Sequence, residues 1–267
     1  MRAQPAKPAK TISTPAFVGV LDSGVGGLSV LREIHRLLPD TPTLYYADQA
    51  HLPYGPRPAS EICHFVEVIA DFLIEQGAAL IVLACHSASA AALERLRKRC
   101  PEIPIVGIEP AVKPAAEATR TGVIGVLTTQ ATADGALYRR VVARYAANVR
   151  VITRVSPELV TMVEQGSRDE AILRTCIEPL LEAGADQIVL ACTHFPFLKA
   201  SLQQITDVTL VDPGAAVARQ TRRVLPPSVH AEAGINRYYT SGSPEQLQAM
   251  LKELIGVDAE VGDGLKV

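Results

Sequence analysis

Residues 75–87 read Glu-Gln-Gly-Ala-Ala-Leu-Ile-Val-Leu-Ala-Cys-His-Ser, and residues 182–194 read Glu-Ala-Gly-Ala-Asp-Gln-Ile-Val-Leu-Ala-Cys-Thr-His. Both copies have the pattern of a helix end, a glycine stop and a buried strand, with a cysteine, Cys85 or Cys192, at the carboxyl end of the strand. Because the offset is far longer than a solenoid repeat, it predicts two related α/β halves. If the halves face each other, the two thiols flank one cleft from opposite sides. Other pairs of segments repeat at nearly the same offset: 18–23 with 124–129, and 105–111 with 210–214.

Length and composition exclude several classes of protein. The 267 residues can bury a large core in one or two domains. The formal net charge of −2 gives no indication of a nucleic-acid or membrane partner. No apolar run approaches the roughly 20 residues of a membrane-spanning helix. Residues 1–15 have no apolar core, so we expect a disordered tail and no signal peptide there.

The cysteines indicate a reducing compartment, and hence the cytoplasm. Their number is odd and their spacing is scattered, which argues against a disulfide framework. No Cys-x-x-Cys pair or His-Cys cluster has the spacing of a zinc site, so no metal is expected. The five are Cys63, Cys85, Cys100, Cys176 and Cys192.

Strand and helix patterns alternate along the chain, which predicts parallel strands joined by right-handed crossovers. Besides the two cysteine strands, we expect strands at 17–21, 43–47, 104–108, 123–127, 149–154, 208–211 and 237–240. Helices are expected at 28–38, about 62–73, about 88–99, about 132–146, about 159–163, 170–182, 217–224 and 244–254. Residues 48–58 and 226–234 are expected to be irregular loops.

The predicted fold is therefore α/β, with two pseudo-symmetric doubly wound parallel-sheet domains and the active site in the cleft between them. The first domain comprises residues 16–109 plus 219–267, and the second comprises residues 110–218. The C-terminal stretch has no counterpart after Ile108 in the first copy. We expect it to pack back on the first half, which makes that domain discontinuous.

Cys85 and Cys192 are the leading candidates for chemistry. In doubly wound sheets, ligands bind outside the carboxyl ends of the strands. A thiol at a helix N-terminus has a depressed pKa, because the helix dipole favours the thiolate. Buried cysteines are commonly inert, but two in matched copies, each followed by polar residues, favour a functional role.

The loop Asp22-Ser23-Gly24-Val25-Gly26-Gly27 connects a predicted strand to a helix. Such a turn resembles a phosphate or dinucleotide loop, but an acid heads it and the P-loop lysine is missing. Its glycines more readily bring backbone N–H groups close to a small anion such as a carboxylate. Asp22 could be a plain helix cap; its place at a strand end beside the cleft favours a polar catalytic role.

Two further residues differ in how much the local sequence says about them. His194 could be a core histidine, but its position next to a candidate nucleophile or base favours a general acid–base role. Glu164, in Met-Val-Glu-Gln-Gly, reads from its surroundings as an exposed helix acid.

Several motifs, in this order, together resemble the glutamate racemases of the cofactor-independent aspartate/glutamate racemase family. The resemblance runs from about residue 17 to about residue 225. It implies two α/β domains around a glutamate-binding cleft, interconversion of L-glutamate and D-glutamate, and supply of D-glutamate for peptidoglycan. It implies no pyridoxal phosphate, no metal and a homodimer. The motifs are Asp22-Ser23-Gly-Val-Gly-Gly, Ala47-Asp48 through Pro53-Tyr54-Gly55, Ala84-Cys85 with Ser87-Ala88, Glu109-Pro110-Ala111, and Cys192-Thr193-His194-Phe195-Pro196.

The resemblance also implies residue roles. Cys85 corresponds to the thiol that takes the α-proton from D-glutamate, and Cys192 to the thiol that takes it from L-glutamate. Asp22 and His194 correspond to polar assistants of the thiols, and Glu164 to an acid near the second cysteine. The implied substrate-binding residues are Asp22, Ser23, Pro53, Tyr54, Gly55, His86, Ser87, Thr132, Thr193 and His194.

This chain departs from the family pattern near both thiols. His86 and Ser87 stand where Asn and Thr are usual, and Ala191 stands where Gly is usual. Ser87 keeps the hydroxyl, and Ala191 adds one methyl. His86 is bulkier and, with an ordinary pKa of about 6.5, is expected to change the acid limb of kcat/KM. The alternative is that His86 turns away and only packs.

The chemistry of racemisation fits two thiols in duplicated halves, because inversion of one carbon needs a base on each face. Other readings remain open at this stage. An aspartate racemase or another racemase of the same superfamily would share these features. A non-catalytic two-lobed binding protein does not explain two retained thiols, and a cysteine hydrolase needs only one of them.

Overall fold

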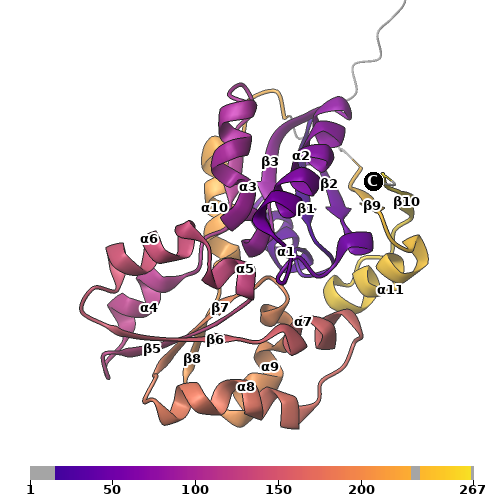
Figure 1. Ribbon diagram of the computed structural model, residues 1–267. Helices are drawn as coiled ribbons and strands as arrows, with labels where there is room; N and C mark the ends of the chain where they lie inside the picture. The colour runs from indigo at the N-terminus through magenta and orange to yellow at the C-terminus, as the bar shows by residue number, and fades with distance from the viewer. Residues whose placement is uncertain (1–15, 230–234, 266–267) are drawn as a thin grey trace, which may run out of the picture.

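The computed structural model describes residues 16–229 and 235–265. Within these ranges the strands form two parallel sheets flanked by helices, which confirms the predicted α/β class (Figure 1). No helix in these ranges is long and apolar enough to cross a membrane. The disordered tail predicted for residues 1–15 lies outside the described residues.

The first sheet has the strand order β10-β9-β2-β1-β3-β4, and the second has the order β6-β5-β7-β8. The strands are β1 (Phe17–Asp22), β2 (Thr43–Ala47), β3 (Ala78–Leu83), β4 (Ile105–Gly107), β5 (Val123–Thr128), β6 (Arg150–Val155), β7 (Gln187–Ala191), β8 (Thr209–Val211), β9 (Arg237–Thr240) and β10 (Val261–Asp263). The α-helices are α1 (Leu28–Leu37), α2 (Ala59–Glu75), α3 (His86–Arg99), α4 (Val112–Ala118), α5 (Gln130–Ala133), α6 (Ala136–Tyr145), α7 (Pro157–Glu164), α8 (Glu170–Glu182), α9 (Lys199–Ile205), α10 (Gly214–Val224) and α11 (Pro244–Ile255). Two 3-10 turns are η1 (Gln49–His51) and η2 (Phe195–Leu198).

The two sheets repeat one topology. The order β2-β1-β3-β4 in the first sheet matches β6-β5-β7-β8 in the second, which confirms the two related halves inferred from the sequence. In each half the second strand pairs with one side of the first strand, and the third strand pairs with the other side of the first strand. The carboxyl ends of β1 and β3, and of β5 and β7, are therefore the switch points where ligands bind in such sheets.

The repeated stretch forms the same local structure twice. β3 and β7 are buried along almost their whole length, as expected for apolar strands in a parallel sheet. Before each of them, Gly77 and Gly184 have φ values of 99° and 85°. Only glycine adopts such values readily, so these two residues end α2 and α8 and turn the chain into the strands.

The C-terminal segment returns to the first half, as predicted. β9 pairs in parallel with β2, and β10 extends the same sheet beyond β9. Figure 1 shows this yellow segment, with α11, beside the strands that begin the chain. The division at residues 109/110 and 218/219 stays a prediction; residue 218 lies within α10.

The local structure differs from the predicted elements at a few places. A single helix was expected at about 132–146, but the extended backbone of Gly135 separates α5 from α6. α3 begins at His86, two residues before the predicted start. The short elements α4, α9 and β10, together with both 3-10 turns, were not predicted.

Candidate active site

A cavity of about 170 Å³ lies at the carboxyl ends of strands from both sheets. Both candidate thiols line it, as the internal repeat predicted. Cys85 follows β3 of the first sheet, and Cys192 follows β7 of the second. The lining residues are Ser23, Pro53, Tyr54, Gly55, Pro56, Cys85, His86, Ser87, Thr129, Gln130, Val155, Pro157, Val160, Cys192, Thr193 and His194.

Cys85 is the N-cap residue of α3 and is buried. Its Sγ donates to Ser23 Oγ at 3.8 Å. Burial, reinforced by the negative charge of Asp22, raises the pKa of the Cys85 thiol above its ordinary value, although the backbone N–H of Ala88 acts in the opposite direction. The prediction of a depressed pKa is therefore wrong for Cys85, because desolvation outweighs the helix end.

Cys192 lies beside a buried imidazole and a buried carboxylate. His194 Nδ1 is 3.7 Å from Cys192 Sγ, and His194 Nε2 is 2.6 Å from Glu164 Oε1. Glu164 is the last residue of α7 and only 8% exposed. The local sequence indicated an exposed acid, and that interpretation is wrong; the packing of α7 against η2 brings Glu164 next to the imidazole, as the family resemblance implied.

Cys192, His194 and Glu164 form a row of buried groups, and within it the imidazole of His194 and the carboxylate of Glu164 form an ion pair. Burial alone lowers the pKa of His194, but hydrogen bonds to Cys192 and Glu164 raise it well above the ordinary value. Burial also disfavours the charged form of Glu164 and so raises its pKa. The hydrogen bond and charge of His194 outweigh this effect and bring the pKa of Glu164 below its ordinary value. The raised pKa of His194 and the lowered pKa of Glu164 both favour the charged form of the residue. The ring is therefore protonated on both nitrogens and lies between a carboxylate and the sulfur.

Asp22 ends β1 and is fully buried next to this row. Its Oδ2 accepts from the N–H groups of Gly24 and Gly27 at 3.1 and 3.0 Å, and its Oδ1 accepts from Thr193 Oγ1 at 3.3 Å. Burial raises the pKa of Asp22, while the charge of His194 and the two N–H groups act against that rise. The carboxyl thus connects the first sheet to the residue that follows Cys192.

The glycine-rich loop is shaped by close contact with the other half. Val25 N–H donates to Glu164 Oε1 at 2.8 Å. A Cβ at Gly24 would overlap Glu164, and a Cβ at Gly26 would overlap the His194 ring. The N–H groups of this loop thus bind carboxylates of the protein itself, and the expected approach of a small anion to the loop stays a prediction.

The structure brings most of the predicted site residues to the cavity and leaves three behind its wall. Asp22 and Glu164 lie behind the wall, where they contact Thr193 and His194. Thr132 does not line the cavity; its Oγ1 accepts from Thr129 Oγ1 at 3.0 Å. The predicted residues that line the cavity are Ser23, Pro53, Tyr54, Gly55, Cys85, His86, Ser87, Cys192, Thr193 and His194.

Sequence reasoning missed two polar lining residues, Gln130 at the start of α5 and, just before it, Thr129. Thr129 follows β5, and its Oγ1 lies 3.0 Å from Ser87 Oγ, so it joins the two halves across the cavity. A signal was present, because Thr129 is the repeat counterpart of Ser23 in the match between residues 18–23 and 124–129. No local pattern marked the apolar wall formed by Val155, Pro157 and Val160.

His86 opens α3 beside Cys85 and is 2% exposed. Within the described residues, neither ring nitrogen has a hydrogen-bond partner. Burial lowers the pKa of His86 to about 3. The expectation that this ring titrates within the working pH range is therefore wrong, and the alternative of a neutral, packed histidine fits better.

Potential metal ligands are not gathered anywhere in residues 16–229 and 235–265. These ranges contain no group of three or more His, Cys, Asp or Glu side chains arranged to hold a metal ion. All five cysteines are free thiols. The reactive and polar groups at and behind the cavity include thiols, an imidazolium, carboxyls and hydroxyls.

Comparison with known proteins gives consistent results. The family model described as Asp/Glu/Hydantoin racemase matches residues 18–221. A protein from Ectopseudomonas mendocina named glutamate racemase is 48% identical over 255 residues, which cover 92% of this chain and 97% of that protein.

Two solved structures have a TM-score of 0.85 with this chain, and each comparison covers 94% of this chain and 98% of the other. One is a glutamate racemase isoform from Bacillus anthracis, 29% identical. The other is the Escherichia coli glutamate racemase in complex with L-glutamate and the activator UDP-MurNAc-Ala, 34% identical.

Proposed function

Because the chain belongs to the Asp/Glu/Hydantoin racemase family, we propose that it interconverts L-glutamate and D-glutamate by proton transfer between two thiols. One observation carries the proposal above all. Cys85 and Cys192 occupy equivalent positions in the two copies of one α/β unit, and both line a single cavity. The relatives named glutamate racemase support the choice of glutamate as substrate.

The proposed reaction removes one proton from the α-carbon and adds another proton to the same carbon. In the direction from L-glutamate, the Cys192 thiolate takes the α-proton, and the electron pair of the C–H bond remains on the carbon and its carboxylate. The Cys85 thiol then donates its proton to the opposite face, which gives D-glutamate. After this turnover Cys192 carries the proton and Cys85 is the thiolate. Turnover in the reverse direction, from D-glutamate, restores the starting protonation of both residues.

The surroundings suit the two thiols to these starting states. The His194 imidazolium can donate a hydrogen bond to a Cys192 thiolate at the observed 3.7 Å separation. The pKa of Cys85 is raised by burial, so this residue holds its proton near neutral pH. A Cys192 thiolate as base and the Cys85 thiol as acid form the pair that the direction from L-glutamate needs.

The carbanion needs donors aimed at the α-carboxylate and a site without bulk water. The hydroxyl groups of Ser23, Ser87, Thr129 and Thr193 line the cavity and can supply such donors. Val155, Pro157 and Val160 also line the cavity, and their apolar side chains limit the water there.

The finer parts of the proposal follow the family resemblance. They comprise supply of D-glutamate for peptidoglycan, a homodimer, and a cytoplasmic location consistent with five free thiols. They also include the division into domains of residues 16–109 plus 219–267 and residues 110–218. Aspartate is the alternative substrate to exclude.

The proposal is tested with the purified protein in D₂O, with L-glutamate and L-aspartate in separate reactions. Proton NMR follows loss of the α-proton signal, and polarimetry follows loss of optical rotation. We expect both changes with L-glutamate and little change with L-aspartate. Exchange of neither amino acid would refute racemase activity, and faster exchange of L-aspartate would reassign the substrate.

A further inference from the structure

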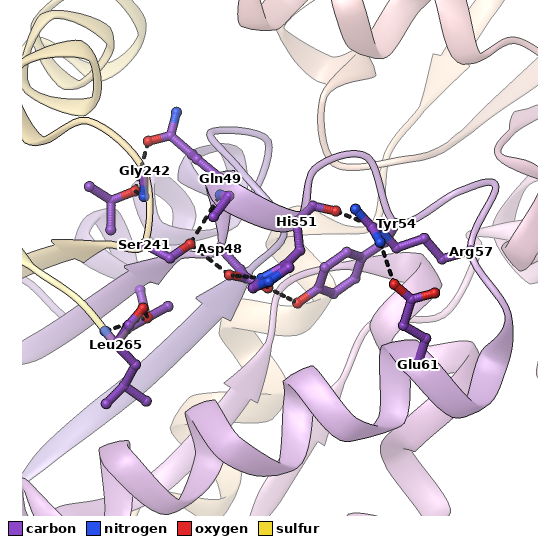
Figure 2. A network of polar contacts seen from close by, with 12 residues as sticks. Asp48, Gln49, His51, Tyr54, Arg57, Glu61, Ser241, Gly242 and Leu265 are labelled. Carbon is purple, nitrogen blue, oxygen red and sulfur yellow. Dashed lines mark hydrogen bonds and ion pairs between the residues drawn. The ribbon is translucent and has the colours of Figure 1, made fainter. Parts of the chain in front are cut away.

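A buried polar network lies directly behind the Tyr54 side of the cavity. Tyr54 Oη donates to Asp48 Oδ2 at 2.6 Å, and His51 Nδ1 is 2.9 and 3.0 Å from the two oxygens of the same carboxylate. Asp48 is 1% exposed, and Tyr54 is equally buried. Figure 2 shows the Asp48 side chain between His51, Tyr54 and Ser241.

The remaining partner of this carboxylate comes from the far end of the chain. Ser241 Oγ donates to Asp48 Oδ1 at 2.7 Å and accepts from Ala50 N–H at 3.1 Å. Ser241 N–H also donates to the Ala47 carbonyl at 3.1 Å, so the backbone fixes where this hydroxyl lies. The Ser241 hydroxyl is thus used as both donor and acceptor at the start of η1.

The neighbouring residue makes a parallel contact. Thr240 Oγ1 donates to Gln49 Oε1 at 2.8 Å and accepts from Gly242 N–H at 2.9 Å. The corner after β9, residues 240–242, therefore contacts two successive side chains of the loop that leads to Tyr54. This corner lies beyond residue 221, where the match to the family model ends.

We propose that the corner at residues 240–242 is a positioning element of the substrate site, in which the Ser241 hydroxyl acts through Asp48 to hold Tyr54 and the adjoining Pro53 and Gly55 against the cavity. This inference rests on the proposed function, because it concerns the binding of glutamate.

The chemistry of the contacts favours positioning by Ser241. A carboxylate accepts hydrogen bonds more strongly than a neutral group, so each of its donors is oriented by it. Burial and the charge of Asp48 raise the pKa of Tyr54, so the phenol keeps the proton that it donates. Removal of the Ser241 hydroxyl leaves the Ala50 N–H and one Asp48 oxygen short of a partner. Asp48 Oδ1 then keeps only its contact with His51, so the carboxylate that orients Tyr54 is held less firmly.

Ser243 offers a matched control two residues away. Its Oγ accepts from Gln246 N–H at 3.2 Å as the N-cap of α11 and donates to Glu245 Oε2 at 2.8 Å. Among the described residues, Ser243 Oγ makes no hydrogen bond to the Tyr54 loop. Ser241→Ala and Ser243→Ala therefore delete the same group, one within the corner at residues 240–242 and one just after it. A purely structural role predicts lower stability in both variants and no change in KM in either.

The experiment measures KM and kcat for L-glutamate, per folded protein, in the wild type and both alanine variants. We expect Ser241→Ala to raise KM about fivefold, the factor that one hydrogen bond is worth, with a smaller change in kcat. Ser243→Ala should keep the wild-type KM, and Ser241→Thr, which retains a hydroxyl, should restore most of the loss. In the Tyr54→Phe background, which lacks the hydroxyl at the other end of the link, Ser241→Ala should add little.

An unchanged KM in Ser241→Ala overturns the proposal, whatever happens to its melting temperature. An equal rise in KM in Ser243→Ala also overturns it, because the effect is then general loosening. Ser241→Cys, with a weaker donor of similar size, replaces the alanine variant if the latter does not fold and should also raise KM. Absence of racemisation in the wild type would instead refute the proposed function, so the two failures are distinct.

Discussion

At the residue scale, the two thiols have equivalent places in the repeat but different partners. Cys85 has a hydroxyl and a negative charge nearby, whereas Cys192 has an imidazolium at 3.7 Å. The places of both thiols could be predicted from the sequence, because each ends a strand. The partner of His194 could not be predicted from the local sequence, and only the family resemblance implied it, because Glu164 is 30 residues away along the chain and tertiary packing brings the two together.

Replacement of either thiol tests the division of roles. Cys85→Ser and Cys192→Ser should each lower kcat by about 10² to 10⁴-fold, because a hydroxyl is a far weaker acid than a thiol. Racemisation rates for both enantiomers measure this. Cys100→Ser, at a partly exposed position outside the site, is the matched control and should stay near the wild-type rate. Wild-type rates in either site variant would contradict the two-thiol mechanism.

Glu164→Gln tests the ion pair. The carboxylate helps to raise the pKa of His194, so its removal should lower that pKa. The imidazolium is present below its pKa and lost above it, so the alkaline limb of kcat/KM for L-glutamate should move to lower pH by about one unit or more. A pH–rate profile from pH 6 to 10 measures this. An alkaline limb at its wild-type position would show that Glu164 does not act through the imidazole.

His86 should affect acid stability and leave the pH profile of activity unchanged. Its folded-state pKa is about 3 and its unfolded value is about 6.5, so the unfolded state binds the extra proton between these pH values. Stability contributed by neutral His86 is present above pH 6.5 and declines as the pH falls through this window.

His86→Asn should therefore retain roughly 2 kcal/mol more of its neutral-pH stability at pH 4.5 than the wild type does. Urea unfolding of both proteins at pH 4.5 and 7.5 measures the difference. The acid limb of kcat/KM should be the same in both. Equal acid destabilisation, or a shifted acid limb, would show that the ring is accessible and titrates near its ordinary pKa.

At the element scale, the long amphipathic helices and buried strands could be predicted, because apolar periodicity determines them. Short elements such as α4 and β10 could not, since three to seven residues carry too little periodic signal. The break between α5 and α6 depends on the extended backbone at Gly135, which the helical pattern on either side conceals. The loop of residues 22–27 was recognised, but its contacts with the second half depend on how the halves pack.

Gly26→Ala tests the close approach of that loop to the imidazole. The added Cβ overlaps the His194 ring, so the ring must move. A displacement of about 1 Å typically costs around 10²-fold in rate, and kcat/KM should fall by that order. Gly214→Ala is the control, because its Cβ would approach the flexible side chains of Asp212 and Glu33 at 3.3 Å and the Ser29 carbonyl oxygen only at an ordinary contact distance of 3.8 Å. Near-normal activity in Gly26→Ala would mean that the loop is not held against His194.

At the scale of the whole molecule, the duplication explains why one cavity holds two similar groups. The repeat in the sequence predicted two facing halves, and the matching strand orders confirm them. The return of the C-terminal stretch to the first half was also predicted. Its pairing with β2 and the contacts of residues 240–242 with the Tyr54 loop were not, because they join segments about 190 residues apart. Such contacts follow from the three-dimensional pairing of strands and leave no local pattern in the sequence.

The central claim is that two thiols act on opposite faces of one α-carbon, and initial-rate isotope incorporation in D₂O tests it most directly. L-Glutamate is incubated to about a tenth of equilibrium, the enantiomers are separated, and α-deuterium in each is measured by mass spectrometry. We expect the D-glutamate formed to carry one α-deuterium while the remaining L-glutamate keeps its protium, because the proton removed by Cys192 is not the one delivered by Cys85. Early deuterium in the L-glutamate pool equal to that in the product, or D-glutamate that keeps the original proton, would contradict the two-thiol account.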